Sequence, residues 1–600
     1  MRIILHLCIY FIFPLMMCAQ NLYTIKVVDA LTMEPIKHCI ITSDDSTESF
    51  LTNEDGIVAI KQNSGAAKKN YFYPGYEKMS VSVMDVMQTG IIALKKISTF
   101  ATENGLIANE KKVLNRFKKC RNLLKKAKIL HSKAYLVQTC YDNGEPIELN
   151  KYYYNSTVKG ISVVENNLKA GQFAFTANPD KLFLTLSNTK IFIKGDVFSL
   201  NEIFPATPFA VDPDQLHNIF AFNRKSPSAE QSELHITFEP IVQSGSTCSG
   251  EIIMDKDSKP LNIKINVRNT LKFPFKPVKD SDSISNVNID LSYIFNPDQK
   301  DIQLKLVELD YSFILHSKTE EGMINERKIR SQVVLHFYDF THSFWISNLI
   351  YYFDEYDAGY RAATLIPYDS LFWANNNSLI WSESQLKQIR HFEEDGVMFN
   401  IGEGLKVGAH KPDSIIQNVI NYIQIQTYRW QTELYYVPPT DIKYYSKFTF
   451  SFRQYFHYPE RAITREKIYS YKPNINIPGN IYLDLNQYGD TIIPTSHLLF
   501  MPESSNYYAD GSSQSFAYFN IFMDIKELRR RRLIEEMEKL NTVDAMRKYC
   551  IKHWPKIYKE MKKIEKETKH GSNLKALAKW NEYLAREIGK DNFAFFGVGK

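Results

Sequence analysis

The sequence predicts a mainly β protein with additional helices: an N-terminal β-sandwich, a large antiparallel β-sheet domain, a mixed α/β region and a helical C-terminus. The 36 Tyr and 38 Phe among 600 residues favour strands. Apolar residues alternate with polar ones through residues 133–340, whereas they recur at three- and four-residue steps after residue 516. A chain of this length exceeds what one core holds, and 44% apolar with 23% charged residues is a globular composition.

We expect six segments along the chain, each bounded by a change of periodicity or by turn residues. They are a signal peptide (1–19), a β-sandwich (22–97), a linker with an amphipathic helix (98–132), an antiparallel β domain (133–340), a mixed α+β region (341–515) and a helical C-terminal region (516–600).

The first nineteen residues have the pattern of a secretory signal peptide. Met1-Arg2 supplies a positively charged end and an apolar run follows. Cys18-Ala19 supplies the small residues of a cleavage site, so cleavage would make Gln20 the new N-terminus. The alternative is lipidation of Cys18, but Met17 before it is not small. No later run reaches the roughly 20 apolar residues that cross a bilayer. We therefore expect an exported protein, periplasmic or associated with the outer membrane.

Residues 24–83 contain short apolar runs separated by turn residues, as in a small sandwich. Gly56 closes a tight hairpin turn after Asp55 and is expected at positive φ, which glycine adopts without steric cost. Pro35 separates two strands, and Gly75 relaxes the backbone beside Tyr76.

This pattern resembles the carboxypeptidase-regulatory-like domain, a transthyretin-type sandwich at the front of many secreted and outer-membrane proteins of Bacteroidetes. The order of sandwich, helix and strands, followed by Tyr368-Asp-x-x-Phe-Trp373, resembles an uncharacterised envelope family that carries the same module. The resemblance implies placement and binding, because the module has no catalytic group of its own. An envelope protein or a glycan is the partner it implies.

The middle of the chain predicts antiparallel strands. Residues 261–268 alternate strictly and pair with residues 250–254 through the turn at 255–260. The buried parity changes after Leu306, which predicts a β-bulge at Val307–Glu308. Further strands are expected at Tyr135–Tyr141, Ile147–Tyr154, Lys181–Leu186, Leu234–Phe238 and Val287–Phe295. The outline resembles the curved sheet of bacterial envelope carriers of lipids and lipoproteins, which gives an alternative function as carrier of a hydrophobic ligand or lipoprotein.

Helices are expected at several places. An amphipathic helix spans Leu106–Ala127, and Ser382 with Gln385 forms a capping box for a helix that ends at Gly396. Another helix runs from Asp413 toward Trp430, before aromatic strands at 444–456. The C-terminal region predicts a helix from Phe516 to Leu540 and helices at Val543–Lys569 and Leu574–Ile588. Arg529–Arg532 and the later lysines are interleaved with glutamates at helical spacing. They indicate a salt-bridged face, with a peripheral outer-membrane contact as the sharper alternative.

The search for chemistry predicts no catalytic residue and no cofactor. His391-x-x-Glu394, with His497 about a hundred residues later, matches the ligand spacing of zinc carboxypeptidases, so a hydrolase of that type is a further alternative. With 14 His in the chain one such match arises by chance, and we expect no metal there. The five cysteines after residue 19 are scattered and no disulfide framework is expected. A net charge of +6 without a nucleic-acid module excludes nucleic acid as the expected partner. The favoured function is a non-catalytic binding or scaffold role in the envelope.

Overall fold

The structure is a computed structural model. It describes residues 22–43, 49–61, 68–97, 110–185, 189, 204–225, 233–242, 248–273, 282–318, 324–347, 358–376, 380–409, 412–425, 428–430, 443–444, 448–449, 474–476, 479–488, 491–500, 506–508 and 512–599. The predicted signal peptide (1–19) lies outside these residues.

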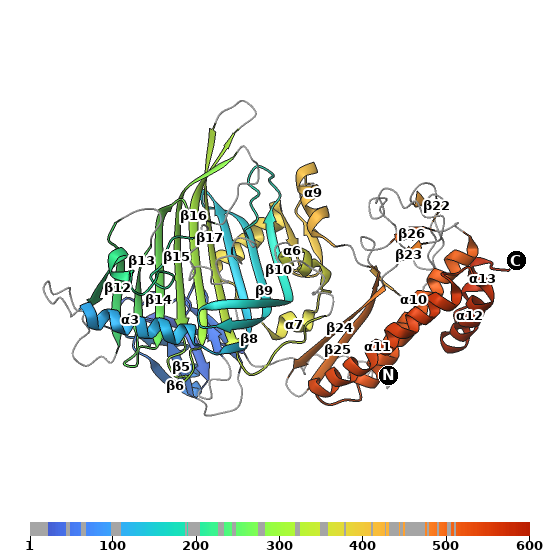
Figure 1. The fold of residues 1–600 in the computed structure, drawn as a ribbon, viewed down its shortest axis with the longest axis horizontal. Helices are drawn as coiled ribbons and strands as arrows, with labels where there is room; N and C mark the ends of the chain where they lie inside the picture. Colours follow the sequence, from blue (N-terminus) through green and yellow to red (C-terminus); the bar gives the residue numbers. More distant parts are fainter. Residues whose placement is uncertain are drawn as a thin grey trace, which may run out of the picture. The chain divides into compact units, whose positions relative to one another are not determined.

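The chain forms two compact units, which we describe separately. The first comprises residues 1–343 and 368–417, and the second comprises residues 344–367 and 418–600. The expected fold class is confirmed: the protein is mainly β, with a large antiparallel sheet in the first unit and helices at the C-terminal end of the second (Figure 1).

The N-terminal part of the first unit is a β-sandwich. One sheet has the order β4-β1-β7, where β1 (Leu22–Asp29) pairs with β4 (Ile57–Lys61) and β7 (Ile91–Leu94). The other has the order β3-β2-β5-β6 and contains β2 (Ile40–Ser43), β3 (Ser49–Leu51), β5 (Lys68–Phe72) and β6 (Met79–Ser82), which α2 (Val83–Thr89) follows. Inward-facing residues of both sheets form one core, which includes Ile25, Val27, Ile41, Val58, Ile60 and Tyr71.

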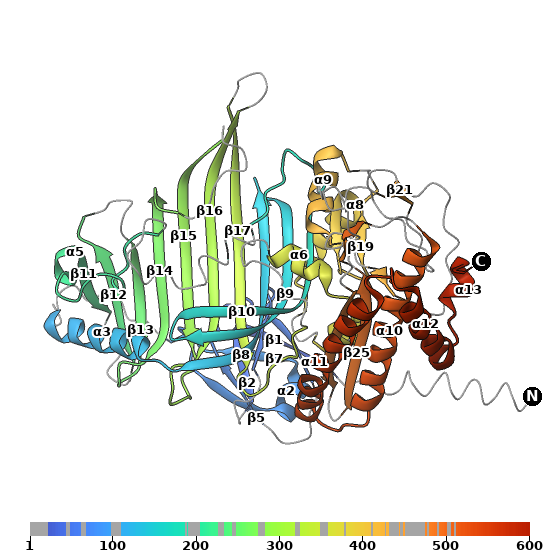
Figure 2. The same ribbon diagram turned by 45° about the vertical axis from the view of Figure 1, so that its right-hand side comes forward.

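The rest of the first unit is built on a 12-stranded antiparallel sheet of two meanders. The first contains β8 (Ile129–Asp142), β9 (Glu145–Lys159) and β10 (Ser162–Thr176), and the second contains β11 (Phe220–Lys225), β12 (Leu234–Pro240), β13 (Ser249–Met254), β14 (Pro260–Thr270), β15 (Ser283–Phe295), β16 (Leu304–Lys318) and β17 (Ile324–Asp339). They join where β17 pairs with β8, and β18 (Gly396–Phe399) and β19 (Leu405–Val407) extend the other edge (Figure 2).

Helices cover parts of this sheet. The amphipathic helix α3 (Glu110–Lys125) buries Phe117, whose ring lies 5.1 Å from that of Phe222 on β11. Helix α8 (Glu383–Asp395) begins at the predicted capping box, in which Ser382 and Gln385 bond each other's backbone amides. Its Phe392 packs with Leu149 of β9 and other residues of the sheet.

The predicted β-bulge at Val307–Glu308 is wrong. Strand β16 pairs with β17 in unbroken register from Leu306 to Lys318. Its two irregularities against β15 lie between Leu304 and Leu306 and between Ser312 and Ile314, on either side of the predicted position. The sandwich covers the face that carries His336, the cross-strand neighbour of Leu306. Both faces of β16 are therefore buried at this end, so apolar residues of both parities fit without a bulge.

The predicted strand at Lys181–Leu186 is also wrong, because residues 181–185 join no ladder and Leu186 lies outside the described residues. The segment instead crosses a face of the 12-stranded sheet. Phe183 is buried there, with its ring 5.5 Å from that of Phe313 on β16. A segment buried against a sheet face needs apolar residues just as a buried strand does, so its sequence pattern resembles that of a strand.

The second unit contains α6 (Ala358–Leu365), most of α9 (Ser414–Ile423), a sheet of order β20-β25-β24, and the helices α10 (Ser513–Met537), α11 (Val543–Thr568), α12 (Leu574–Ile588) and α13 (Asn592–Phe596). Trp430 follows β20 (Tyr428–Arg429), and its indole nitrogen donates to Asp524 of α10 at 3.0 Å in a core shared with β24 (Gly479–Tyr488) and β25 (Thr491–Phe500). Within the described ranges, no helix has the length and apolarity needed to span a bilayer.

The expected helix from Asp413 toward Trp430 is wrong in length. Helix α9 ends at Ile423, where the Thr364 hydroxyl donates to the Ile423 carbonyl at 3.0 Å and accepts from the Ile425 amide at 3.0 Å. The Thr364 side chain thus makes hydrogen bonds that a further turn of α9 would otherwise make. Of the expected aromatic strands at 444–456, the structure describes β21 (Lys443–Tyr444) and β22 (Phe448–Thr449), which pair antiparallel, and the other residues of that range lie outside the described residues.

Candidate functional site

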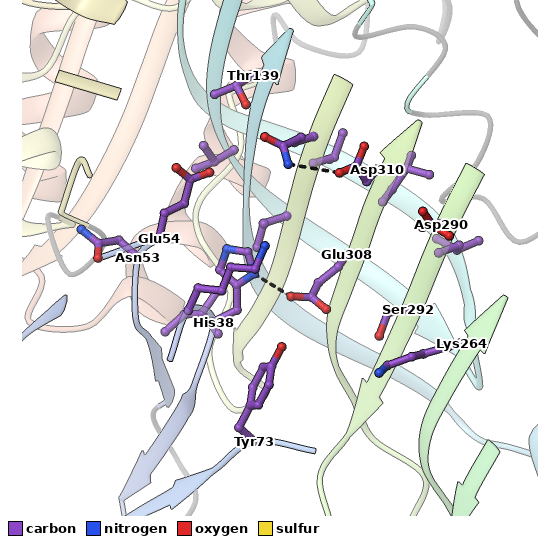
Figure 3. A pocket seen from close by; sticks show the side chains of 18 of the residues that line it. His38, Asn53, Glu54, Tyr73, Thr139, Lys264, Asp290, Ser292, Glu308 and Asp310 are labelled. Carbon is purple, nitrogen blue, oxygen red and sulfur yellow. Dashed lines mark hydrogen bonds and ion pairs between the residues drawn. The ribbon is translucent and has the colours of Figure 1, made fainter. Parts of the chain in front are cut away.

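A cleft of about 280 Å³ lies between the N-terminal sandwich and one face of the 12-stranded sheet, both in the first unit (Figure 3). We call this side of the sheet the cleft face. The sandwich contributes Lys37, His38, Leu51, Asn53, Glu54 and Tyr73, the sheet contributes residues of β8 and β14 to β17, and α8 contributes Gln385. The cleft thus exists because two folded parts meet.

Strand periodicity brings the polar lining of the sheet together. Side chains two apart on a strand share a face, so Glu308 and Asp310 of β16 project on the same side. Ser292 of β15 lies opposite Glu308, and Lys264 of β14 lies opposite Ser292. Figure 3 shows Lys264, Glu308 and Tyr73 converging from three directions. Cross-strand register therefore places residues more than forty positions apart in one row.

His38 is a sandwich residue that contacts the sheet inside the cleft. It has φ +57°, and its amide donates to the Thr52 carbonyl at 3.1 Å, which fixes the backbone of this turn. Its Nδ1 lies 2.6 Å from Oε1 of Glu308. Burial by itself raises the pKa of Glu308, but the hydrogen bond and charge of His38, with Lys37 and Lys264 nearby, outweigh burial and hold that pKa below its usual value.

The other charges of the cleft face are also paired within the sheet. Asp310 accepts from Arg330 at 2.5 and 3.0 Å and from Gln332 at 3.1 Å. Asp290 accepts from Arg268 at 2.6 Å. A carboxylate has about four acceptor positions, so these oxygens keep capacity for a ligand while their orientation is fixed.

Contacts on either side of the cleft hold the sandwich in place. The Ser49 hydroxyl lies 2.9 Å from Nε2 of His336, whose pKa burial lowers well below its usual value, with Lys305 acting in the same direction. The backbone amide of Glu383, at the start of α8, donates to Oδ2 of Asp55 at 2.7 Å. These contacts make the cleft a preformed feature of the first unit.

The structure places the five predicted turn residues around the sandwich, and none of them lines the cleft. Gly56 has φ +72° and Gly75 has φ +88°. Pro35 bridges to Val28, and the Tyr76 hydroxyl donates to Asp29 at 3.0 Å. Asp55 is more than a turn residue, because it accepts from the N-terminus of α8, while its neighbours Asn53 and Glu54 line the cleft.

The three candidate zinc ligands are placed in different units. His391 and Glu394 lie one turn apart on α8 in the first unit, and His497 lies on β25 in the second, stacked at 6.2 Å on Tyr482. Burial lowers the pKa of His497 to about 4, with Arg429 and Arg530 contributing. Among the described residues, no three His, Cys, Asp or Glu side chains are grouped so that they could hold a metal ion.

A second polar cluster surrounds Glu148 on the opposite face of the sheet. Its carboxylate accepts from the Asn150 amide at 2.6 Å and from the amide and hydroxyl of Thr185 at 2.8 and 2.7 Å. Burial raises the pKa of Glu148 to about 7, although these hydrogen bonds act against the rise. The side chain is fully enclosed, so we assign it to the packing of residues 181–185 on the sheet.

Sequence reasoning missed every sheet residue of the cleft. The sequence did contain a signal of this polar face, in the form of polar residues two positions apart, such as Asp290 with Ser292 and Glu308 with Asp310. Such pairs also mark the solvated face of any antiparallel sheet, so the pattern alone does not identify a site.

No known family model and no curated protein matches the chain. Among solved structures, MucB has 9% identity and a TM-score of 0.15, with 38% of this chain and 94% of that one covered. The MucA/MucB complex of Pseudomonas aeruginosa has 8% identity and a TM-score of 0.13, covering 37% and 93%. A protein of unknown function from Bacteroides fragilis, described as membrane-associated, has 8% identity and a TM-score of 0.10, covering 53% and 98%. Similarities at these TM-scores carry no argument about function.

Proposed function

We propose that this chain is an exported cell-envelope protein with a non-catalytic binding role, and that its ligand is a neutral glycan held in the cleft between the sandwich and the sheet. The observation that carries the proposal is the lining of the cleft. Carboxylates and amides from two folded parts face one cavity, and partners within the protein already fix the charged groups that the sheet contributes.

The pairing of charges favours a neutral ligand. Glu308 is paired with His38, Asp310 with Arg330 and Asp290 with Arg268, while Lys264 lies 3.0 Å from Glu251. A charged ligand would have to break one of these pairs or rely on Lys37 or Glu54, the lining charges for which the described residues supply no ion pair. An unpaired charge in a partly desolvated cleft is costly. A ligand that only donates and accepts hydrogen bonds avoids that cost.

The side-chain types favour hydroxyl groups as the recognised chemistry. Fixed carboxylate oxygens of Asp310 and Glu308 accept from hydroxyl donors, and such charge-assisted hydrogen bonds are stronger than neutral ones. The amides of Asn53 and Gln385 offer both a donor and an acceptor. A ligand with neighbouring hydroxyls, as in a sugar ring, uses both kinds of group. The proposed glycan partner is also the kind that the resemblance of residues 22–97 implies.

The lining gives less support to an apolar carrier. A site for an acyl chain needs a predominantly apolar cavity. Leu51, Val137 and Val334 contribute apolar surface to the cleft, but acids, amides and lysines surround them.

The binding test uses the mature chain, from Gln20 onward, on an array of neutral and acidic glycans, followed by calorimetry on any that bind. We expect neutral glycans to bind, and Asp310→Asn to weaken binding roughly tenfold or more because it removes a charged acceptor. Glu326→Gln, on the same sheet but outside the cleft, is the matched control and should bind like the wild type. A preference for acidic glycans, or equal affinity of Asp310→Asn and wild type, would refute the assignment.

Export is tested separately. The full chain, expressed in a bacterium of the Bacteroidetes group with a C-terminal tag, should be recovered from the envelope fraction with an N-terminus near Gln20. Recovery of the uncleaved chain from the cytoplasm would contradict the proposal.

A further inference from the structure

The most conspicuous basic run of the sequence, Arg529–Arg532 on α10, is neutralised in the fold. Arg529 makes two hydrogen bonds to Glu560 of α11, at 2.6 and 2.7 Å. Arg530 and Arg531 both bind Glu527, at 2.6 and 3.0 Å. Arg532 pairs with Glu587 of α12. Arg529 and Arg532 therefore link α10 to α11 and α12, whereas Arg530 and Arg531 pair within α10. The four arginines leave little charge for a partner.

A different set of cations remains accessible on α11. Six lysines recur at steps of three and four and therefore share one side of the helix. All six are exposed, and we call them the basic stripe: Lys548, Lys552, Lys556, Lys559, Lys563 and Lys566. Lys563 lies 3.7 Å from Glu567, whereas no carboxylate of the described residues lies within 4.0 Å of the other five.

The stripe has a fixed direction because the other side of α11 is part of the core. Met561 and Ile564 are buried in the cluster that α10 and α12 share, and Cys550 is buried in a neighbouring one. The helix therefore cannot rotate to disperse its lysines. Like charges four residues apart destabilise a helix, so the stripe costs stability unless an anionic partner offsets it.

Two large apolar side chains border the stripe. Ile551 and Tyr558 are 68% and 59% exposed, and they lie seven residues apart, on the same side of the helix two turns from each other. The amine of Lys562 lies 4.6 Å from the centre of the Tyr558 ring. An exposed isoleucine gains nothing from a nucleic-acid backbone, whereas it gains from burial at the boundary between lipid headgroups and acyl chains.

We infer that the basic stripe of α11 docks the second unit onto an anionic phospholipid surface. The lysines meet the negative headgroups, while Ile551 and Tyr558 enter the boundary between the headgroups and the acyl chains. The helix lies along the surface and does not cross it. This inference rests on α11 alone and is independent of the ligand in the cleft.

The test measures co-sedimentation of the mature chain with vesicles of phosphatidylcholine alone or with added phosphatidylglycerol. We expect binding to the anionic vesicles only, and its loss when salt is raised from about 0.1 M to about 1 M, since the screening length falls from about 10 Å to about 3 Å. Each surface lysine contributes roughly fivefold to such binding. A variant carrying Lys552→Gln, Lys556→Gln and Lys559→Gln should therefore partition on the order of a hundredfold more weakly.

The matched control removes the same charge elsewhere. Lys111→Gln, Lys112→Gln and Lys119→Gln, all exposed on α3, should leave partitioning nearly unchanged. Ile551→Ser should weaken binding several-fold without altering its dependence on salt.

A second measurement needs no variant. Acetylation of the wild-type chain should be slowed by anionic vesicles at Lys552 and Lys559 but not at Lys111. Equal binding to neutral vesicles, equal losses in both triple variants, or no protection of the stripe would overturn the inference. Stripe-dependent binding of a DNA oligonucleotide without binding to vesicles would replace the lipid by a nucleic acid.

Discussion

Gly56 offers the sharpest test of how the sandwich is built, because two separate effects require glycine there. The first is its backbone, at φ +72°. The second is space: a Cβ at this position would lie 2.6 Å from the Val27 carbonyl oxygen and 3.0 Å from Cβ of Pro35. That carbonyl already accepts from the Ile36 amide at 2.9 Å, so it cannot move away without losing a hydrogen bond.

Gly75 separates these two effects. It has φ +88°, yet a Cβ there would meet nothing within 4 Å. Gly75→Ala should therefore cost only the left-handed backbone, roughly 1–2 kcal/mol. Gly56→Ala should cost the same amount plus the displaced hydrogen bond, which adds about 1 kcal/mol and brings the total to roughly 2–3 kcal/mol.

Hydrogen exchange of the full chain, followed by peptide mass spectrometry, can measure both costs. The Val27 amide donates to the Gly56 carbonyl at 2.8 Å, so peptides of β1 report directly on this turn. Each 1.4 kcal/mol lowers the protection tenfold. If both variants lost equal protection, the steric part of the argument would be wrong; if neither lost any, the backbone part would be wrong as well.

Three further predictions follow from single side chains. The pKa of Glu148 is raised from 4.5 to about 7 in the folded chain, so its contribution to stability is complete below pH 4.5 and is lost as pH rises toward 7. Glu148→Gln cannot ionise and should exceed the wild type by up to about 3 kcal/mol in urea unfolding at pH 8 but not at pH 4; the same difference at both pH values would contradict this. Ser382→Ala should lower the protection of α8 by about 1 kcal/mol while Ser382→Thr retains the cap, and an unchanged exchange rate in the alanine variant would show that the cap contributes nothing. Purified protein exposed to zinc should hold less than one equivalent, unaltered by His391→Ala; stoichiometric zinc that this substitution removes would restore the hydrolase alternative.

Local patterns allowed much of the fold to be predicted. The alternation in 261–268 and the capping box at Ser382 are set by neighbours in the sequence, and both occur as expected. The errors arose where tertiary contacts decided the outcome. Residues 181–185 have the apolar pattern of a strand, but they cross a sheet face and bury Phe183 and Thr185 there. Helix α9 stops where Thr364, some sixty residues earlier, binds its last carbonyl.

The candidate cleft could not be predicted in the same way. Its central ion pair joins His38 to Glu308 across 270 positions, and the docking of the sandwich on the sheet creates the contact. Nothing in the sequence around His38 indicates which strand it will meet.

The cleft face also shows why a polar strand face should not be equated with a solvated one. Alternation in β14 to β16 predicts one apolar and one polar side, and the polar side carries Asp290, Glu308 and Asp310. When the sandwich covers part of that side, burial becomes costly for each carboxylate that lacks a partner. Each of the three has one, from the sandwich or from an adjacent strand. The ion pairs that offset the cost of burying these carboxylates under the sandwich also hold them in fixed orientations. A binding site for hydroxyl groups requires this rigidity.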